Sequence, residues 1–424
     1  MKIKTKEMSY SEVCALTPVK QKNPVRQSRI LRRVMYLLSK KEWKETSFSY
    51  EEIGMEALAK GEPCLILMNH SSFTDLQIIA GIFRKRQYHI VCTNDGFIGK
   101  SGFMRRLGCI PAGKFITDIR LVKSMLYCVR KLKSSVVMYP EASYSFDGSE
   151  TPLPLSLGKF LKQMQVPVVM VKTQGAFLRD PLYNCLQKRK TKVSATVKYL
   201  LSKEQIASMD AGTLNRLLAE EFSYDHFRDQ KARGVKITEK FRADGLQRVL
   251  YKCPCCREEG QMVGKGVQIT CTACNKSYTL GEDGLLSADS GDTEFAYVTD
   301  WYSWERACVK QEIIEEAYRI DVDVDIYILA DMKAVYHVGE GHLLHTKEGF
   351  HLTGCEGELD YSLKSSARYS LYADYFWYEI GDMISIGDMH RQYYCFPKNQ
   401  KNAPVAKARL ATEEIYKLLT AALS

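Results

Sequence analysis

Strand-like and helix-length segments alternate along the chain from Gly61 to about Leu201, and few folds accommodate such an alternation. Segments of helical length between apolar, β-branched runs are typical of crossover connections between parallel strands. The alternation therefore predicts an α/β domain with a mixed sheet flanked by helices. In such sheets, ligands bind at the carboxyl ends of the strands. The strand-like runs are CLILMN, YHIVCT, SVVMYP, PVVMVKT and KVSATVKYL.

The remainder of the chain differs in character. With 424 residues the chain is long enough for two or three domains. A helical stretch near residue 304 is followed by many short runs with alternating aromatic residues, which predict a β-rich C-terminal domain with a closing helix. We interpret this domain as pleckstrin-homology-like. The predicted division is an α/β domain with a basic N-terminal segment (1–235), a cysteine-rich module (246–286) and the β-rich domain (292–424).

The cysteine-rich module contains two Cys-x-x-Cys pairs, Cys253 with Cys256 and Cys271 with Cys274. Four thiolates at this spacing suit one tetrahedral ion and leave no open coordination position, so we predict a zinc ribbon with a structural Zn²⁺. Cys255 is a further thiol beside the first pair, but the two-residue spacing favours Cys253 and Cys256. A redox motif would need only one such pair, which disfavours that alternative.

Zinc ribbons often bind nucleic acid or protein. This module lacks the interleaved basic and aromatic residues of a nucleic-acid surface, so nucleic acid is not an expected partner.

A basic amphipathic segment runs from Arg29 to Lys44, in a chain whose formal net charge is +10. Its apolar residues recur at helical spacing among Lys and Arg residues. Such a helix suits an anionic membrane surface, and it equally suits an apolar face packed on the protein core with the charges in solvent. The pattern alone leaves both interpretations open.

The sequence lacks a run of about 18 apolar residues, which a membrane-spanning helix would need, and its N-terminus lacks an apolar signal segment. Its 14 cysteines do not resemble the framework of a small secreted disulfide protein. We therefore expect a reducing, cytoplasmic compartment.

A polar elbow, NHSSFTD, follows the first strand-like run and contains His70 and Asp75. If a helix begins near Ser72, Asp75 lies in its first turn, close enough to bond one imidazole nitrogen of His70. The carboxylate would fix the tautomer and leave the other nitrogen free to accept a proton. The alternative is structural, because Ser72 and Asp75 also have the spacing of a capping box.

The elbow and a second polar loop, YPEASYS, together resemble the glycerophospholipid acyltransferase family, which includes lysophosphatidate and glycerol-phosphate acyltransferases. The first family motif, asparagine-histidine-x-x-x-x-aspartate, is matched by Asn69, His70 and Asp75. The third, phenylalanine-proline-glutamate-glycine-threonine-arginine-serine, is met by residues 139–145. The second and fourth are approximated by GCIPAGK and VPVVMV. The resemblance covers about residues 60 to 200.

The resemblance implies an acyltransferase-type sheet and a role for each motif residue. His70 would be the general base on an acceptor hydroxyl that attacks the thioester of acyl-CoA or acyl-carrier protein, and Asp75 would orient its imidazole. Polar and cationic residues would bind the substrate: Asn69, Glu141, Ser143, Lys114, Arg105 and Arg106.

The chain departs from the family at the positions that hold phosphate. The third-motif glycine is Ala142, its arginine is Tyr144, and the second-motif arginine is Lys114. Arg binds phosphate bidentately, whereas Lys and Tyr do not, so the usual phosphate clamp is weakened. Arg105 and Arg106 are candidates to replace it.

We predict a cytoplasmic O-acyltransferase of phospholipid biosynthesis, peripheral to the inner face of the membrane. It would move a fatty acyl group from acyl-CoA or acyl-carrier protein to a hydroxyl of a lysophospholipid or related lipid, with an anionic membrane surface as partner. The alternative is a catalytically degenerate acyltransferase-like protein that binds lipid or protein, with the zinc ribbon as an interaction module. Intact His70 and Asp75 favour the enzyme, while Ala142 and Tyr144 favour the alternative.

Overall fold

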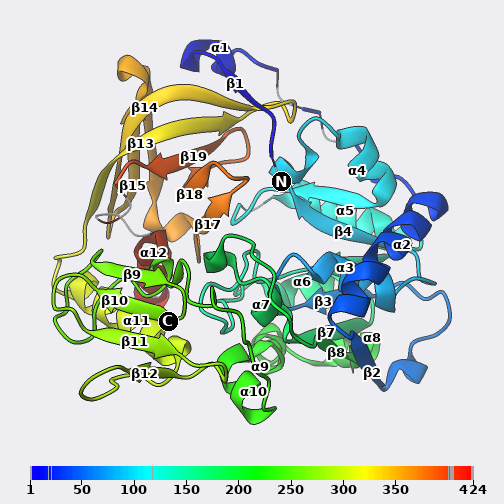
Figure 1. Ribbon diagram of the computed structural model, residues 1–424. Helices are drawn as coiled ribbons and strands as arrows, with labels where there is room; N and C mark the ends of the chain where they lie inside the picture. The colour runs from blue at the N-terminus through cyan, green and yellow to red at the C-terminus, as the bar shows by residue number, and fades with distance from the viewer. Residues whose placement is uncertain are drawn as a thin grey trace.

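The computed structural model describes residues 2–17, 19–20, 22–116, 118–399, 401 and 405–421. These residues form a seven-stranded, a four-stranded and an eight-stranded sheet. In Figure 1 the seven-stranded sheet lies on the right, the four-stranded sheet at the lower left and the eight-stranded sheet at the upper left. Among these residues, no helix has the length and apolar character needed to span a bilayer.

The seven-stranded sheet has the order β2-β8-β7-β3-β6-β4-β5. Neighbouring strands are parallel except for β7 and β8, so the predicted mixed sheet is confirmed. The strands are β2 (Ser49–Ile53), β3 (Leu65–Met68), β4 (Tyr88–Thr93), β5 (Cys109–Ala112), β6 (Ser135–Met138), β7 (Val168–Gln174) and β8 (Ser194–Leu201).

Helices cover both faces of the central strand β3, whose side chains alternate between two cores because of the strand pleat. Leu65 and Leu67 lie in the core formed with α5, α6, α8 and α9, whereas Ile66 and Met68 lie in the core formed with α3. The helices of this domain are α2 (Arg29–Glu45), α3 (Asp75–Ile82), α4 (Ser101–Leu107), α5 (Ile119–Arg130), α6 (Leu157–Met164), α7 (Ala176–Arg179), α8 (Lys203–Ser208), α9 (Ala211–Phe222) and α10 (His226–Ala232).

The predicted site loops follow adjacent parallel strands. The elbow leaves β3 and the third-motif loop leaves β6, and these two strands pair with each other. Their carboxyl ends therefore bring the two loops to the same edge of the sheet, as the alternation of elements predicts.

The four-stranded sheet is antiparallel with the order β12-β11-β10-β9. It has few buried apolar side chains of its own and packs against α11 (Val298–Ile314), where Tyr278 meets Trp301 at 4.9 Å between ring centroids. The strands are β9 (Met262–Lys265), β10 (Gln268–Cys271), β11 (Ser277–Leu280) and β12 (Leu286–Ala288).

The C-terminal sheet has the order β16-β15-β14-β13-β19-β18-β17, and α12 (Val405–Ala421) packs against it, which confirms the predicted β-rich domain with a closing helix. The pleckstrin-homology-like interpretation stays a prediction. The first strand of the chain, β1 (Thr5–Glu7), pairs with β14, and α1 (Tyr10–Cys14) follows it. The strands are β13 (Ile320–Leu329), β14 (Val335–Thr346), β15 (Gly349–Gly354), β16 (Leu359–Lys364), β17 (Tyr372–Trp377), β18 (Gly381–Gly387) and β19 (Gln392–Pro397).

One hydrophobic core joins all three parts of the chain. It contains Phe146 of the third-motif loop, Tyr278 of the four-stranded sheet, Trp301 of α11 and Tyr375 of β17. The division into 1–235, 246–286 and 292–424 stays a prediction, and buried contacts cross each of these boundaries.

Candidate active site

The elbow holds His70 and Asp75 in contact. His70 Nδ1 lies 3.0 Å from Asp75 Oδ2, which also accepts hydrogen bonds from the backbone N–H groups of Ser71, at 3.0 Å, and Ser72, at 3.3 Å. With Asp75 ionised, Nδ1–H donates to the carboxylate. His70 Nε2 has no hydrogen-bond partner among the described residues, so its lone pair is available to a substrate.

The expected capping box is only half formed. Helix α3 begins at Asp75 with Thr74 as its N-cap, later than the predicted start near Ser72. The Ser72 N–H reaches Asp75, but Ser72 Oγ bonds Thr74 Oγ1 at 2.6 Å and accepts the Thr74 N–H at 3.1 Å instead of capping the helix. Asp75 thus acts at the elbow as a shared acceptor for backbone and imidazole.

Glu141 links the third-motif loop to the elbow. Its carboxylate accepts the His70 N–H at 2.7 Å, the Thr151 N–H at 2.9 Å and the Tyr224 hydroxyl at 3.1 Å. Burial raises the pKa of Glu141 to about 7, and the bonds from Thr151, His70 and Tyr224 oppose this rise. The side chain is inside the protein, where it fixes the backbone of the elbow.

The imidazole of His70 lies between two tyrosine rings. Its centroid is 4.2 Å from that of Tyr139 and 3.9 Å from that of Tyr144, and 14% of the side chain is exposed. Burial, and then the charge of Lys114, lower the pKa of His70 well below its usual value of 6.5. Burial raises the pKa of Asp75, opposed by the N–H groups of Ser71 and Ser72. The environment therefore favours the neutral imidazole, the form that a general base needs.

Lys114 lies beside this cluster. Its ammonium is 4.1 Å from the centroid of the Tyr372 ring and 5.9 Å from that of Tyr144. It makes no hydrogen bond or ion pair with any residue that the structure describes. Of the predicted cations, Lys114 is the one that lies near His70.

Arg105 and Arg106 occupy the last turn of α4. Arg105 donates to the backbone carbonyls of Lys22, at 3.1 Å, and Asn23, at 2.6 Å. No described contact joins either arginine to the residues around His70, so the structure does not bring them to this cluster.

Asn69 and Ser143 are also inside the protein. The Asn69 amide donates to Ser71 Oγ at 2.9 Å and accepts the Thr173 N–H at 2.8 Å, which ties the end of β3 to β7. Ser71 Oγ lies 3.1 Å from Nε2 of the buried His226, which was not among the predicted site residues.

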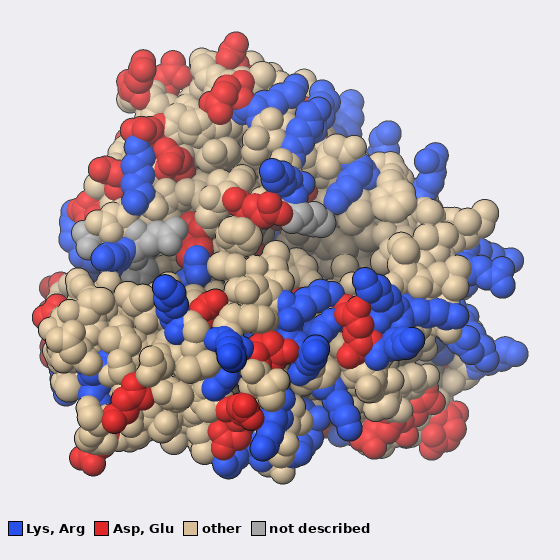
Figure 2. Space-filling view, in the orientation of Figure 1, with Lys and Arg blue, Asp and Glu red and all other residues tan. Residues whose placement is uncertain are grey.

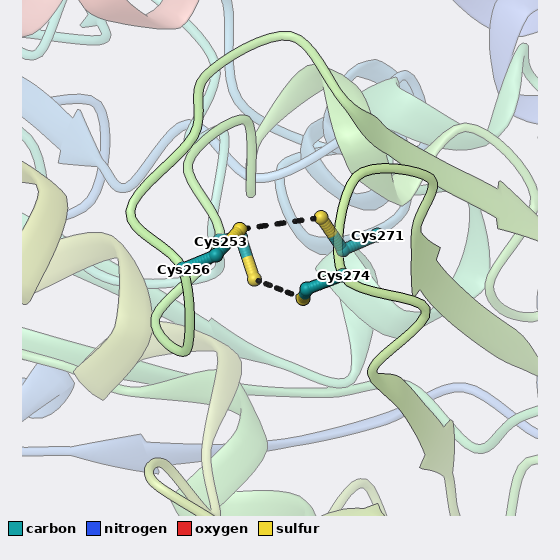
Figure 3. A group of neighbouring side chains, drawn as sticks. All are labelled: Cys253, Cys256, Cys271 and Cys274. Carbon is teal, nitrogen blue, oxygen red and sulfur yellow. Dashed lines mark hydrogen bonds between the residues drawn. The ribbon is translucent and has the colours of Figure 1, made fainter.

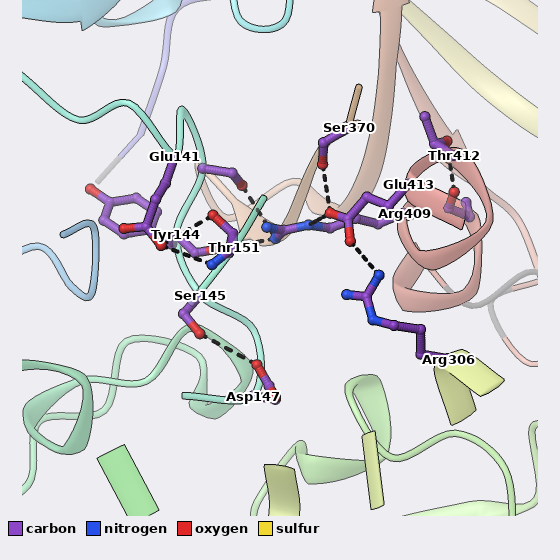
Figure 4. A network of polar contacts seen from close by, with 12 residues as sticks. Glu141, Tyr144, Ser145, Asp147, Thr151, Arg306, Ser370, Arg409, Thr412 and Glu413 are labelled. Carbon is purple, nitrogen blue, oxygen red and sulfur yellow. Dashed lines mark hydrogen bonds and ion pairs between the residues drawn. The ribbon is translucent and has the colours of Figure 1, made fainter. Parts of the chain in front are cut away.

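The C-terminal domain supports the third-motif loop (Figure 4). Arg409 of α12 donates to the carbonyl of Tyr144 at 3.0 Å and to Ser143 Oγ at 3.4 Å, and its guanidinium lies 4.4 Å from the centroid of the Phe146 ring. Glu413 pairs with both Arg409, at 3.2 Å, and Arg306 of α11, at 2.8 Å. These residues were not predicted, because the only signal in this part of the sequence was a helix expected to cover the sheet.

The four predicted metal ligands converge (Figure 3). The sulfur atoms of Cys253, Cys256, Cys271 and Cys274 all lie within 4.8 Å of one another, and two of the separations are 3.7 Å. Zn–S bonds of about 2.3 Å in a tetrahedron place the sulfur atoms about 3.8 Å apart, so this group fits a zinc ion. Cys255 is exposed and lies outside the group.

Comparison with known proteins defines the class of the first domain. Residues 50–173 match the family described as Acyltransferase. They form an acyltransferase-family domain, which confirms the family resemblance over this segment. The match does not extend to the cysteine module or the C-terminal sheet.

Among solved structures, the chain is similar to the 1-acyl-sn-glycerophosphate (LPA) acyltransferase PlsC from Thermotoga maritima. The identity is 17% and the TM-score 0.34, over 45% of this chain and 76% of that chain. A search of curated proteins found no match.

Proposed function

We propose that the protein is an O-acyltransferase that moves a fatty acyl group from acyl-CoA or acyl-carrier protein to a hydroxyl of a lysophospholipid or related lipid. The observation that carries the proposal is the His70–Asp75 pair, with a 3.0 Å bond at Nδ1 and an Nε2 that no described residue occupies. The acyltransferase family match supports the reaction class.

In the proposed reaction, His70 Nε2 removes the proton of the acceptor hydroxyl, and the hydroxyl oxygen attacks the thioester carbonyl. The tetrahedral intermediate collapses to the ester and expels the thiolate, which takes the proton from the imidazolium. Asp75 holds the tautomer and stabilises the imidazolium. A thioester is activated enough that no covalent enzyme intermediate is required.

A second candidate function is lipid or protein binding without turnover. The observation that favours it is the position of the His70 ring between Tyr139 and Tyr144, with 14% of the side chain exposed. In an enzyme, an acceptor hydroxyl must reach Nε2 at the edge of this stack. A protein that only binds lipid or protein would not need that access.

The two candidates are separated by incubating the purified chain with labelled acyl-CoA, or acyl-carrier protein, and a panel of lysolipids. We expect an acylated lipid with the wild type and the matched control His351→Ala, whose imidazole is partly exposed on the C-terminal sheet. We expect none with His70→Ala. Equal product from His70→Ala, or no product with any acceptor, would reject the enzyme.

We also propose that α2 binds an anionic membrane surface. Four apolar side chains form a stripe at helical spacing on its outer face and are 44–76% exposed: Ile30, Val34, Leu37 and Leu38. The buried residues of α2 are polar, Ser39 and Glu42, and Glu42 pairs with Arg179 at 2.7 Å and with Lys188 at 2.5 Å, whereas Lys40, Lys41 and Lys44 are exposed. An exposed apolar stripe among Lys and Arg is typical of an interfacial helix.

The charge distribution supports this surface. Figure 2 shows Lys and Arg side chains gathered over the part of the molecule where Figure 1 draws α2 and α4, while Asp and Glu side chains are more frequent over β13 and β14. Cosedimentation with phosphatidylglycerol vesicles tests the proposal. We expect Leu38→Glu to weaken binding and Ile314→Glu, an exposed apolar position of α11, to leave it unchanged; equal binding by all three proteins would contradict it.

For the cysteine group, we propose a structural Zn²⁺ held by Cys253, Cys256, Cys271 and Cys274. A closed set of four thiolates supports a structural role, since no position remains for a substrate. Metal analysis of protein purified without chelator should give about one zinc per chain, as one site of this type binds one ion. A content well below that would reject the zinc ribbon.

A further inference from the structure

The C-terminal sheet contributes polar side chains to the surroundings of His70. Strand β17 carries Tyr372, whose ring lies 4.1 Å from the Lys114 ammonium, and Asp374 two positions further along. Lys114 in turn lies 5.9 Å from the Tyr144 ring, which stacks on His70. A ligand that occupies His70 Nε2 and extends toward Lys114 therefore meets side chains of β17.

Lys114 is the cation available to such a ligand. Its ammonium has no ion pair or hydrogen bond with a described residue, and its charge is the one that acts on His70. Two aromatic faces hold it in place, which leaves its N–H donors free.

Two carboxylates offset this positive charge. Asp95 is 3% exposed and accepts hydrogen bonds from the Tyr372 hydroxyl, at 2.9 Å, and from Trp377 Nε1, at 3.2 Å. Asp374 is 9% exposed and accepts the Tyr375 N–H at 2.9 Å. Burial lowers the pKa of Lys114; the charges of Asp374 and Asp95 oppose this effect, and the charge of Arg409 adds to it. Burial raises the pKa of Asp374 to about 7, and Lys114 opposes this rise.

The other nearby cation is already paired. Arg409 is 3% exposed and binds Glu413, and its remaining bonds go to the third-motif loop. Its guanidinium supports the loop from the side of α12 (Figure 4). If it bound a ligand instead, the buried Glu413 carboxylate would lose one of its two cationic partners.

This charge balance discriminates between two kinds of phosphate. A phosphate monoester carries a charge between about −1.5 and −2 at neutral pH, because its second pKa is about 6. A phosphodiester carries a single negative charge. One free ammonium whose charge is partly offset by two carboxylates is better matched to the single charge than to the double one, because the carboxylates repel each further negative charge.

Building on the proposed function, we infer that the acceptor is a lysophospholipid whose phosphate is a diester, and that Lys114 binds this phosphate. Asp374 accepts a hydrogen bond from the O–H or N–H group of the alcohol that esterifies the phosphate. The same carboxylate disfavours binding of lysophosphatidate, a monoester.

Equilibrium binding of short-chain monomeric lysolipids to the full chain tests the inference independently of turnover. The probes are hexanoyl lysophosphatidylglycerol and hexanoyl lysophosphatidylethanolamine as diesters, and hexanoyl lysophosphatidate as the monoester, measured by calorimetry at neutral pH. We expect the wild type to bind at least one diester on the order of tenfold more tightly than the monoester. We expect Asp374→Asn, which keeps the acceptor for the Tyr375 N–H, to remove most of this preference.

The matched control is Asp360→Asn, an exposed carboxylate on β16, which lies at the other end of the strand order. It should leave the preference unchanged. Equal or tighter binding of the monoester by the wild type, no binding of either diester, or an unchanged preference in Asp374→Asn would overturn the inference. Diester binding with the expected preference but without acyl transfer would support the inference and reject the proposed function.

Discussion

The elbow and the third-motif loop meet at His70, yet the chain stabilises them in different ways. Asp75 bonds residues within five positions of itself: His70, Ser71 and Ser72. The third-motif loop depends on partners far along the chain, above all Arg409, which is 265 positions from Tyr144. Local contacts hold the His70–Asp75 pair, while distant contacts hold the loop that packs against it.

The largest expected effect concerns the local pair. Asp75→Asn keeps an acceptor for the backbone N–H groups but removes the charge that holds the His70 tautomer. We expect kcat to fall by about 10²- to 10⁴-fold, the range of general-base catalysis, with little change in KM. Steady-state kinetics on the preferred acceptor measure both. A kcat of Asp75→Asn within threefold of the wild-type kcat would show that the His70–Asp75 pair does not act as a base.

The next effect concerns the distant support. Arg409→Ala leaves Glu413 buried with Arg306 as its remaining cation, and it removes two donors to the third-motif loop. Removing one partner of a buried ion pair costs about 3–5 kcal/mol. Urea unfolding should show a loss in this range.

The control for this variant is Lys417→Ala on the same helix, a half-exposed lysine that pairs with Glu414. It should cost less than about 1 kcal/mol, as exposed ion pairs do. Equal losses for the two variants would mean that Arg409 is no more important to the loop than a surface charge.

The pH dependence of kcat/KM follows from the lowered pKa of His70. A base with a lowered pKa stays neutral to lower pH, so the acid limb should lie below the usual histidine value of about 6.5. An acid limb centred above 6.5 would contradict this environment. Thermal unfolding at each pH is the control, because the raised pKa values of Glu141 and Asp374, each about 7, also make the fold sensitive to pH.

The smallest effect tests the departure at Ala142. Its φ of 54° lies in the left-handed region, where a side chain costs about 1–2 kcal/mol and glycine does not. Ala142→Gly should therefore raise the free energy of unfolding by about 1 kcal/mol, since the greater freedom of glycine in the unfolded chain offsets part of the gain. A destabilised variant would show that the Ala142 methyl group makes a contact that outweighs this strain.

Much of the site was predictable because its signals are local. The alternation of apolar runs predicts the mixed sheet, and the spacings of His70 with Asp75 and of the four cysteines predict two side-chain groups that the structure brings together. The predicted start of the helix was less accurate. Ser72 and Thr74 bond each other, and α3 begins at Asp75 instead of near Ser72.

Other features depend on which elements pack against each other in the fold, and the hydrophobic periodicity of a segment does not predict its packing partner. The pattern of α2 shows an apolar and a polar face, but it does not show that Glu42 is buried in salt bridges with Arg179 and Lys188 while the apolar stripe is exposed. Likewise, nothing in the local sequence connects Asp374 or Arg409 to loops more than 200 positions earlier in the chain.

The most direct measurement is the rate of thiol release from acyl-CoA, followed together with ester formation, in wild type and His70→Ala. The account predicts one thiol released per ester formed, only when an acceptor is present, and a rate lower by at least about 10²-fold in His70→Ala. An equal rate in the variant, or thiol release by the wild type without ester formation, would contradict it.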